Sequence, residues 1–334
     1  MKPRPVLEVN DLAVQYDTDE GLVEAVRGVS FQVAPGQTLG IVGESGSGKS
    51  VTNLAVLGLI PQPPGKIVSG SIRFRGQELL HMSQRDLSTI RGRKIAMIFQ
   101  DPMTALNPLL TIEDQLTEVT RIHLGHDRQS ARNHAISMLE KVGIPSPERR
   151  LGDYPHQFSG GMRQRVMIAM ALSCKPDVLI ADEPTTALDV TIQAQILRLM
   201  KELQNSAQTA IVLITHDMGV IASACDTVVV MYAGKIVEQA DTATLFRNPR
   251  HPYTLGLLKS MTRLDAPLGT KLTPIEGQPP DLTQLGKGCS FCARCRYAVQ
   301  HCREETPELT KVSSEGLAAC FVDWTADSAG GEGP

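Results

Sequence analysis

The pattern of apolar and polar positions changes character along the chain. Residues 6–42 hold short runs of Val, Leu, Ile and Phe broken by Gly, Asp and Pro, which predicts strands. Over 111–142, apolar residues recur at three- and four-residue spacing, which predicts amphipathic helices. From 162, helical stretches alternate with the continuous apolar runs "DVLIADEP" and "AIVLITHD". Such alternation predicts a parallel sheet covered on both faces.

Shorter patterns add further elements. We expect a helix over 49–60 that Pro61 ends, a strand and turn in "GSIRFRGQELL", and a buried strand in "KIAMIFQ". Residues 226–238 predict a final hairpin. After about 262 the periodic patterns fade, and "LDAPLGTKLTPIEGQPPDL" predicts a linker across a surface.

Composition excludes several classes of protein. The 334 residues suit one large domain or two of ordinary size, and 42% hydrophobic with 21% charged residues is typical of a globular chain. The net charge of -3 and the 4% aromatic content give no basis for binding nucleic acid. No apolar run approaches the ~20 residues that span a bilayer. The first residues lack the apolar core of a signal peptide, so we expect a cytosolic protein.

The stretch "GESGSGKS" fits the phosphate-binding pattern G-x-x-x-x-G-K-[ST] in full and stands between an expected strand and an expected helix. Its glycines let consecutive backbone N–H groups face an anion at a helix N-terminus. Lys49 is expected to reach the β- and γ-phosphates, and the Ser50 hydroxyl to bind Mg²⁺. The expected ATP-binding residues here are Gly43, Glu44, Ser45, Gly46, Ser47, Gly48, Lys49, Ser50 and Val51.

"DVLIADEP" supplies the second part of the expected ATP-binding site. Asp182 and Glu183 end a buried strand, and ligands of open α/β sheets lie at that end. We expect Asp182 to hold Mg²⁺, directly or through water, and Glu183 to polarise the attacking water.

Together with "FSGGMRQRV" at 158–166, these motifs resemble those of ATP-binding cassette (ABC) ATPases over residues 6 to about 240. The resemblance implies an adenine-stacking role for Tyr16, a Q-loop role in catalysis and Mg²⁺ binding for Gln100, and a switch role for His216. "TALD", Thr186–Asp189, resembles the D-loop. In this family two cassettes pair head to tail, so the following would face the partner's ATP: Ser159, Gly160, Gly161, Met162 and Asp189. Met162 departs from the family's usual Gln.

Three C-terminal segments narrow the resemblance: "HPYTLGLL", "PIEGQPPDL" and "GCSFCARCRYAVQHC". With "FQDPMTALNPLLTI", they resemble the ATPase subunits of dipeptide and oligopeptide importers. That implies a second related ATPase subunit, two membrane permeases, an extracytoplasmic substrate-binding protein and a place on the cytoplasmic face of the membrane. Three alternatives stay open: an importer of nickel or other small solutes, a soluble DNA-repair ABC ATPase with a zinc module, or a metal-sensing module.

Five of the seven cysteines follow residue 288, with spacing C-x2-C-x2-C-x6-C-x17-C. Zinc and a [4Fe–4S] cluster both suit four such thiolates. The resemblance favours a [4Fe–4S] cluster on Cys289, Cys295, Cys302 and Cys320. It leaves the role of Cys292 open. Cys174 and Cys225 fall in apolar helical stretches, so we expect both to be core residues.

The expected fold is an α/β ABC-type P-loop NTPase. It combines an N-terminal antiparallel β region, a parallel core sheet, a helical subdomain insert and a small Cys-rich C-terminal extension. The expected domains are a nucleotide-binding domain at 1–260 with its helical subdomain at about 101–175, an extension at 261–324, and a disordered tail at 325–334.

Overall fold

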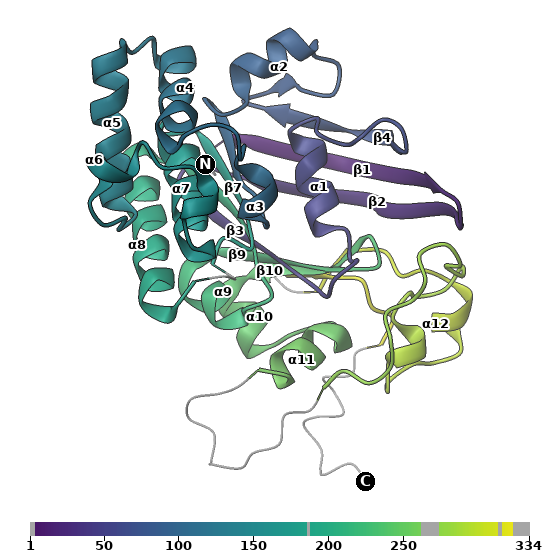
Figure 1. The fold of residues 1–334 in the computed structure, drawn as a ribbon. Helices are drawn as coiled ribbons and strands as arrows, with labels where there is room; N and C mark the ends of the chain where they lie inside the picture. Colours follow the sequence, from purple (N-terminus) through teal and green to yellow (C-terminus); the bar gives the residue numbers. More distant parts are fainter. Residues whose placement is uncertain (1–3, 186–187, 262–273, 313–315, 323–334) are drawn as a thin grey trace. The chain divides into compact units, whose positions relative to one another are not determined.

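The computed structural model describes residues 4–185, 188–261, 274–312 and 316–322 (Figure 1). The chain divides into two compact units that interleave along the sequence. One unit comprises 1–8, 32–38 and 72–215, and the other 9–31, 39–71 and 216–334. The expected boundary at 260 stays a prediction, and the unit that holds 39–71 also holds the cysteine segment. None of the described helices is both long and apolar enough to cross a membrane.

The first unit is built on three parallel strands in the order β8-β7-β6. β7 and β8 are buried at every position, because helices cover the sheet and the strands carry continuous apolar runs. These strands confirm the expected parallel pattern. The unit contains β5 Gln77–Glu78, α2 Gln84–Ile90, β6 Ile95–Ile98, α3 Pro102–Ala105, α4 Ile112–Leu124, α5 Arg128–Lys141, α6 Pro147–Arg150, the 3₁₀ turn η1 Pro155–Gln157, α7 Gly160–Leu172, β7 Val178–Asp182, α8 Val190–Ala207 and β8 Ala210–Ile214.

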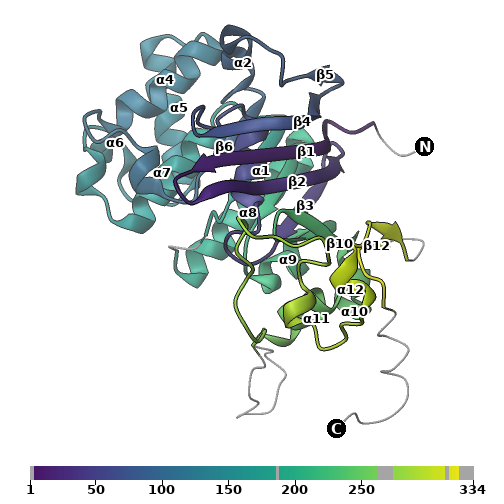
Figure 2. The same cartoon turned by 90° about the vertical axis from the view of Figure 1, so that its right-hand side faces the viewer.

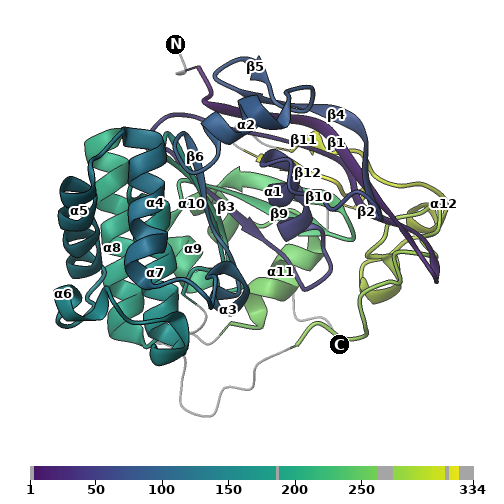
Figure 3. The ribbon, with the colours of Figure 1, turned by 45° about the horizontal axis from the view of Figure 1, so that its top comes forward.

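Helices α4, α5 and α7 pack on one another, and α7 also contacts β6 (Figure 3). This confirms the amphipathic helices expected over 111–142. A capping box begins α4: the Thr111 hydroxyl accepts the Asp114 N–H at 3.1 Å, and the Asp114 carboxylate accepts the Thr111 N–H at 3.3 Å. Gly125, with φ +69°, ends this helix.

The second unit holds β3, β9, β10, β12 and β11 in the order β11-β12-β10-β9-β3. β3 pairs with β9 in parallel, whereas the β9–β10, β10–β12 and β11–β12 pairs are antiparallel. The expected hairpin at 226–238 is therefore confirmed as β9–β10. The strands of this unit are mixed rather than all parallel, because β10 runs antiparallel to β9. The short β12, which its sequence does not signal, adds a further antiparallel pair.

β1 and β2, joined by a two-residue turn, lie for most of their length in this unit, with β4 beside β1. Figure 2 shows α11, α12 and β12 on the same side of the unit. Its elements are β1 Leu7–Thr18, β2 Gly21–Val33, β3 Thr38–Val42, α1 Lys49–Val56, β4 Gly65–Phe74, α9 Met218–Ala224, β9 Thr227–Tyr232, β10 Lys235–Asp241, α10 Thr242–Arg247, α11 Pro252–Lys259, the 3₁₀ turn η2 Cys292–Arg294, α12 His301–Glu304, β11 Thr310–Lys311 and β12 Gly316–Ala318.

Two local expectations need correction. The helix expected over 49–60 ends at Val56, because Gly58 adopts φ +61° and a Schellman motif forms, with Leu59 N–H donating to Leu54 C=O. Pro61 is therefore not what ends it. Cys174 follows α7 and is only half-buried, so it is not a core residue, whereas Cys225 is buried as expected.

We predict that Thr111→Ala destabilises the helical part of the first unit by about 1 kcal/mol, because it removes the cap of α4. Thermal and urea unfolding followed by circular dichroism measures the effect. Glu118→Ala, on the exposed face of the same helix, is the matched control and should change the unfolding midpoint little. Equal midpoints for the two variants would contradict the role of the cap.

Candidate functional site

The phosphate-binding loop connects the buried strand β3 to α1. Gly43 and Gly48 are required by close backbone approaches: a Cβ would lie 2.2 Å from Met231 C=O at the first and 2.4 Å from Ala25 C=O at the second. Gly46 and Gly48 also adopt positive φ, of +77° and +96°. The loop therefore depends on glycine at these positions for steric and conformational reasons together.

Lys49 lies within this loop and is buried, with an 8% exposed fraction. Its ammonium donates to the carbonyl oxygens of Gly43 and Glu44, both at 2.8 Å, and to Ser47 Oγ at 3.3 Å. The Gly234 N–H, in the β9–β10 turn, donates to Ser47 C=O and braces the loop from outside. The Lys49 ammonium is thus held against the loop, in position to bind a phosphate there.

Tyr16 and His216 belong to the same unit as the loop. Tyr16 is half-buried on β1, and its ring lies against Gly65, where an added Cβ would be 2.9 Å from Cε1. His216 is exposed after β8 and lines a cavity of about 630 Å³ together with Gly43 and Glu44. The structure therefore places His216 and the loop at one cavity.

The carboxylates at the end of β7 lie in the first unit with Gln100. Asp182 is buried at 3% exposure, while Glu183 takes φ +48°, a left-handed conformation that a non-glycine residue rarely adopts. Its N–H donates to Ile214 C=O at 2.9 Å, which continues the β7–β8 ladder. Gln100 Nε2 donates to Glu183 Oε2 at 3.3 Å, so the structure brings these two predicted residues together. Strain of this kind is frequent at functional sites.

The signature stretch forms the N-terminus of α7. Ser159 caps the helix, and its hydroxyl accepts the Met162 N–H at 3.3 Å. Ser159 and Gly160 are exposed, and Gly161 and Met162 are partly exposed. Farther along α7, the buried Gln164 donates to Pro184 C=O at 2.8 Å, one residue beyond Glu183. The signature helix is therefore tied directly to the end of β7.

Asp189 is exposed and caps α8, where its carboxylate accepts the Ile192 N–H at 3.0 Å. A helix cap is thus an additional role for this residue. Thr186 and Ala187 of the "TALD" stretch lie outside the described residues.

Five cysteines line one small cavity in the second unit: Cys289, Cys292, Cys295, Cys302 and Cys320. Successive turns bring them together, with N–H donation from Cys289 to Cys302 C=O, from Cys292 to Cys289 C=O, and from Cys295 to Cys292 C=O. Burial and the neighbouring thiols raise the pKa of Cys289 and of Cys295 to about 11. Among the described residues, no three His, Cys, Asp or Glu side chains are grouped closely enough to hold a single metal ion.

The "HPY" segment borders both the cysteine cavity and the phosphate-binding loop. His251 is buried and lines the cavity, and burial lowers its pKa to about 3. Its Nδ1 accepts the Tyr253 N–H at 3.1 Å, so the neutral ring carries its proton on Nε2. Glu238 accepts the His251 N–H at 2.9 Å, and burial raises the pKa of this carboxyl.

Sequence reasoning did not assign residue-level roles to His251, Tyr253 or Arg294. The Tyr253 hydroxyl accepts the Glu44 N–H at 2.8 Å, and Arg294 pairs with the Glu44 carboxylate. The only signal was the "HPY" string, which carries a family likeness but does not indicate Glu44, because Tyr253 and Glu44 are 209 positions apart.

The sequence model of the ABC transporter family matches residues 26–186, and that of the oligopeptide/dipeptide transporter C-terminal region matches 237–302. The chain is 54% identical over 308 residues to the oligopeptide transport ATP-binding protein OppD of Bacillus subtilis, covering 92% of this chain and 86% of that protein. It is 52% identical over 317 residues to the dipeptide transport ATP-binding protein DppD of the same organism, covering 95% and 94%.

Solved structures of ATP-binding subunits are also similar to this chain. A dimeric post-hydrolysis ATP-binding cassette bound to ADP and phosphate matches with a TM-score of 0.64 and 26% identity, covering 71% of this chain and 98% of that one. The cassette cbiO1 of Clostridium perfringens matches with a TM-score of 0.60 and 27% identity, covering 73% and 91%. The chain therefore belongs to the ABC transporter family, among its oligopeptide and dipeptide transport ATP-binding proteins.

Proposed function

We propose that this chain is the ATP-hydrolysing subunit of an importer of dipeptides or oligopeptides. The observation that carries the proposal is the presence, in one chain, of a cassette and of a C-terminal region matched to oligopeptide/dipeptide transporters. Relatives named for peptide transport match both parts, since the identity extends over 92–95% of the chain. The comparisons therefore favour peptide import over the DNA-repair interpretation.

ATP binding begins at the phosphate-binding loop. Phosphate oxygens would take the place of the Gly43 and Glu44 carbonyls as acceptors for the buried Lys49 ammonium. Loop N–H groups and the N-terminus of α1 supply further positive potential. Ser50 and Asp182 provide oxygen donors suited to Mg²⁺, which neutralises phosphate charge when bound, and Gln100 is the third expected ligand.

Hydrolysis requires a water molecule directed at the γ-phosphate. Glu183 is the general base we propose, because it directly follows β7 in a left-handed backbone conformation of the kind found at functional sites. The hydrogen bond from Gln100 orients the Glu183 carboxylate. His216, which shares a cavity with the loop, would contact the γ-phosphate.

A complete site would need a second cassette. Ser159 and Gly160 stand exposed at the N-terminus of α7, and Asp189 is exposed at the start of α8, so all three are accessible to another chain. The structural relative that is dimeric supports a pair of cassettes, and we propose that the two are arranged head to tail. We propose a distinct, related ATPase as partner, two membrane permeases, an extracytoplasmic substrate-binding protein and a peripheral position on the cytoplasmic face of the membrane.

The chemistry of the side chains that line the cysteine cavity is that of a thiolate-ligated group. Its wall combines five cysteines with apolar rings and chain segments that include Phe291 and Phe321. Zinc requires its ligands around one centre, whereas each thiolate of a [4Fe–4S] cluster binds a different iron and so needs less close grouping. We propose the cluster on Cys289, Cys295, Cys302 and Cys320, with zinc as the alternative. Such a group would stabilise a segment that has little apolar core of its own.

We predict that Glu183→Gln leaves ATP binding intact and lowers turnover by at least about 100-fold, because the base is lost. Binding of Mg·ATP and steady-state phosphate release measure the two effects. Glu202→Gln, which neutralises an exposed carboxylate on α8, is the matched control and should turn over normally. Turnover of Glu183→Gln within twofold of the unaltered protein would contradict this role.

The transport function is tested by purification from the native host. We expect an affinity-tagged chain to bring down integral membrane proteins and a second ATPase, and peptide-loaded binding protein to stimulate ATP hydrolysis by the reconstituted complex. Co-purification of DNA with DNA-stimulated hydrolysis would instead support a repair ATPase and sink the transport proposal.

The cysteine proposal predicts a brown protein that absorbs near ~400 nm when it is prepared without oxygen. Iron and sulfide analysis should give a stoichiometric cluster in the unaltered protein and none in Cys302→Ser. Cys292→Ser is the comparison variant, and retention of its absorbance would exclude Cys292 as a ligand. Stoichiometric zinc without iron would overturn the cluster.

A further inference from the structure

The second residue of the phosphate-binding loop is held by two side chains from the C-terminal part of the chain. The Glu44 N–H donates to the Tyr253 hydroxyl at 2.8 Å. The Glu44 carboxylate accepts two hydrogen bonds from Arg294, with Nη1 to Oε2 at 2.6 Å and Nη2 to Oε1 at 3.0 Å. This is a bidentate pair, the geometry in which arginine binds a carboxylate most strongly.

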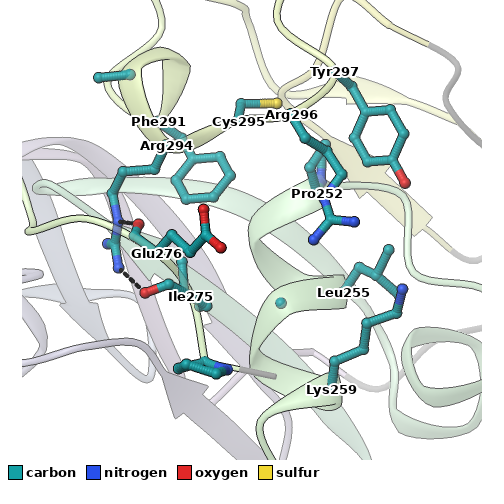
Figure 4. Close-up of a pocket in the computed structure, with 13 residues that line it drawn as sticks. Pro252, Leu255, Lys259, Ile275, Glu276, Phe291, Arg294, Cys295, Arg296 and Tyr297 are labelled. Atoms are coloured by element: carbon teal, nitrogen blue, oxygen red, sulfur yellow. Dashed lines mark hydrogen bonds between the residues drawn. The ribbon is translucent and has the colours of Figure 1, made fainter. Parts of the chain in front are cut away.

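The remaining donors of Arg294 are also engaged. Nη1 donates to the Tyr232 hydroxyl at 3.2 Å. Nε donates to Glu276 C=O at 2.9 Å, and Nη2 donates to Ile275 C=O at 3.3 Å (Figure 4). The Arg294 side chain is only 4% exposed, whereas that of Glu44 is 28% exposed. A guanidinium fixed by so many acceptors holds its carboxylate partner in one place.

An aromatic cluster supports the pair. The rings of Tyr232, Tyr253 and Phe291 pack on one another, with centroids 4.6–5.3 Å apart. The guanidinium carbon of Arg294 lies 5.8 Å from the Tyr232 ring centroid and 5.9 Å from that of Phe291. Cation–π contacts of this kind add to the ion pair when the cation is desolvated.

The backbone of Arg294 is fixed as well. Its N–H donates to Phe291 C=O at 3.0 Å within η2, and it stands between Cys292 and Cys295, which line the cysteine cavity. One short turn therefore presents thiols to the cavity and the guanidinium to the phosphate-binding loop.

Because Glu44 is negatively charged, its ion pair with Arg294 affects the binding of ATP. Glu44 precedes the loop N–H groups that receive an anionic phosphate, so an uncompensated carboxylate there would repel the ligand. We propose that Arg294 is a positioning residue for ATP binding, which neutralises Glu44 and fixes the first half of the phosphate-binding loop. The proposal requires only that the loop binds ATP, and neither a peptide cargo nor a metal in the cysteine cavity.

The test is titration of the full-length chain with Mg·ATP. Arg294→Ala should raise the Kd about tenfold, because it leaves the Glu44 carboxylate unpaired. The Kd of Arg294→Lys should fall between that of the unaltered protein and that of Arg294→Ala, since an ammonium keeps the charge but cannot form the bidentate pair. Arg296→Ala removes an exposed arginine two residues away and is the matched control, with an expected Kd equal to that of the unaltered protein.

Glu44→Gln in the Arg294→Ala background distinguishes positioning from general stabilisation. Removing the carboxylate should restore most of the affinity for ATP that Arg294→Ala loses. If Arg294 only stabilised the fold, the losses of affinity from the two substitutions would add. Circular dichroism checks that each variant is folded, and Arg294→Lys with and without Glu44→Gln carries the same comparison if Arg294→Ala does not fold. An unchanged Kd for the folded Arg294 variants, or additive losses, would overturn the proposal.

Discussion

The pairing of β3 with β9 is the constraint on which the nucleotide-binding part of the second unit depends. The parallel register runs from Leu39 opposite Thr227 to Val42 opposite Val230. The next residue on each strand is Gly43 and Met231, and the loop leaves β3 so close to the Met231 carbonyl that only glycine fits. One residue farther, Tyr232 contributes its ring and hydroxyl to the Arg294 cluster. A single register thus fixes both the start of the loop and the residues that hold Glu44.

In the first unit, the pairing of β7 with β8 likewise fixes a residue of the site, Glu183. This pairing ends at Asp182 opposite Ile214, and the Glu183 N–H then donates to the same Ile214 carbonyl although its own φ is positive. The ladder therefore holds a backbone conformation that Glu183 would not adopt by itself, at a cost of order 1–3 kcal/mol. Gln164 and Gln100 reach this corner from α7 and from the end of β6, so three elements converge on one strained residue.

Most features that depend on local sequence could be predicted, and features that depend on distant pairing could not. The phosphate-binding loop was recognisable because glycine, lysine and serine spacing and the adjoining apolar strand are all contiguous. The end of α1 was wrongly attributed to Pro61, because Gly58 and its Schellman hydrogen bonds act first. β12 was missed because a segment of three residues is too short to show an alternation of apolar and polar positions. It is a strand because it pairs with β10. The Arg294–Glu44 pair joins positions 250 apart, and no pattern along the chain indicates it.

The position of Arg294 in the chain also sets an order of events during synthesis. Chains emerge from the ribosome N-terminus first, so the phosphate-binding loop, α1 and β9 are present well before residues 291–294. Through that interval the Arg294 guanidinium that pairs with Glu44 is not yet present. On the role proposed for Arg294, full affinity for ATP would arrive only with the same turn that carries Cys292 and Cys295.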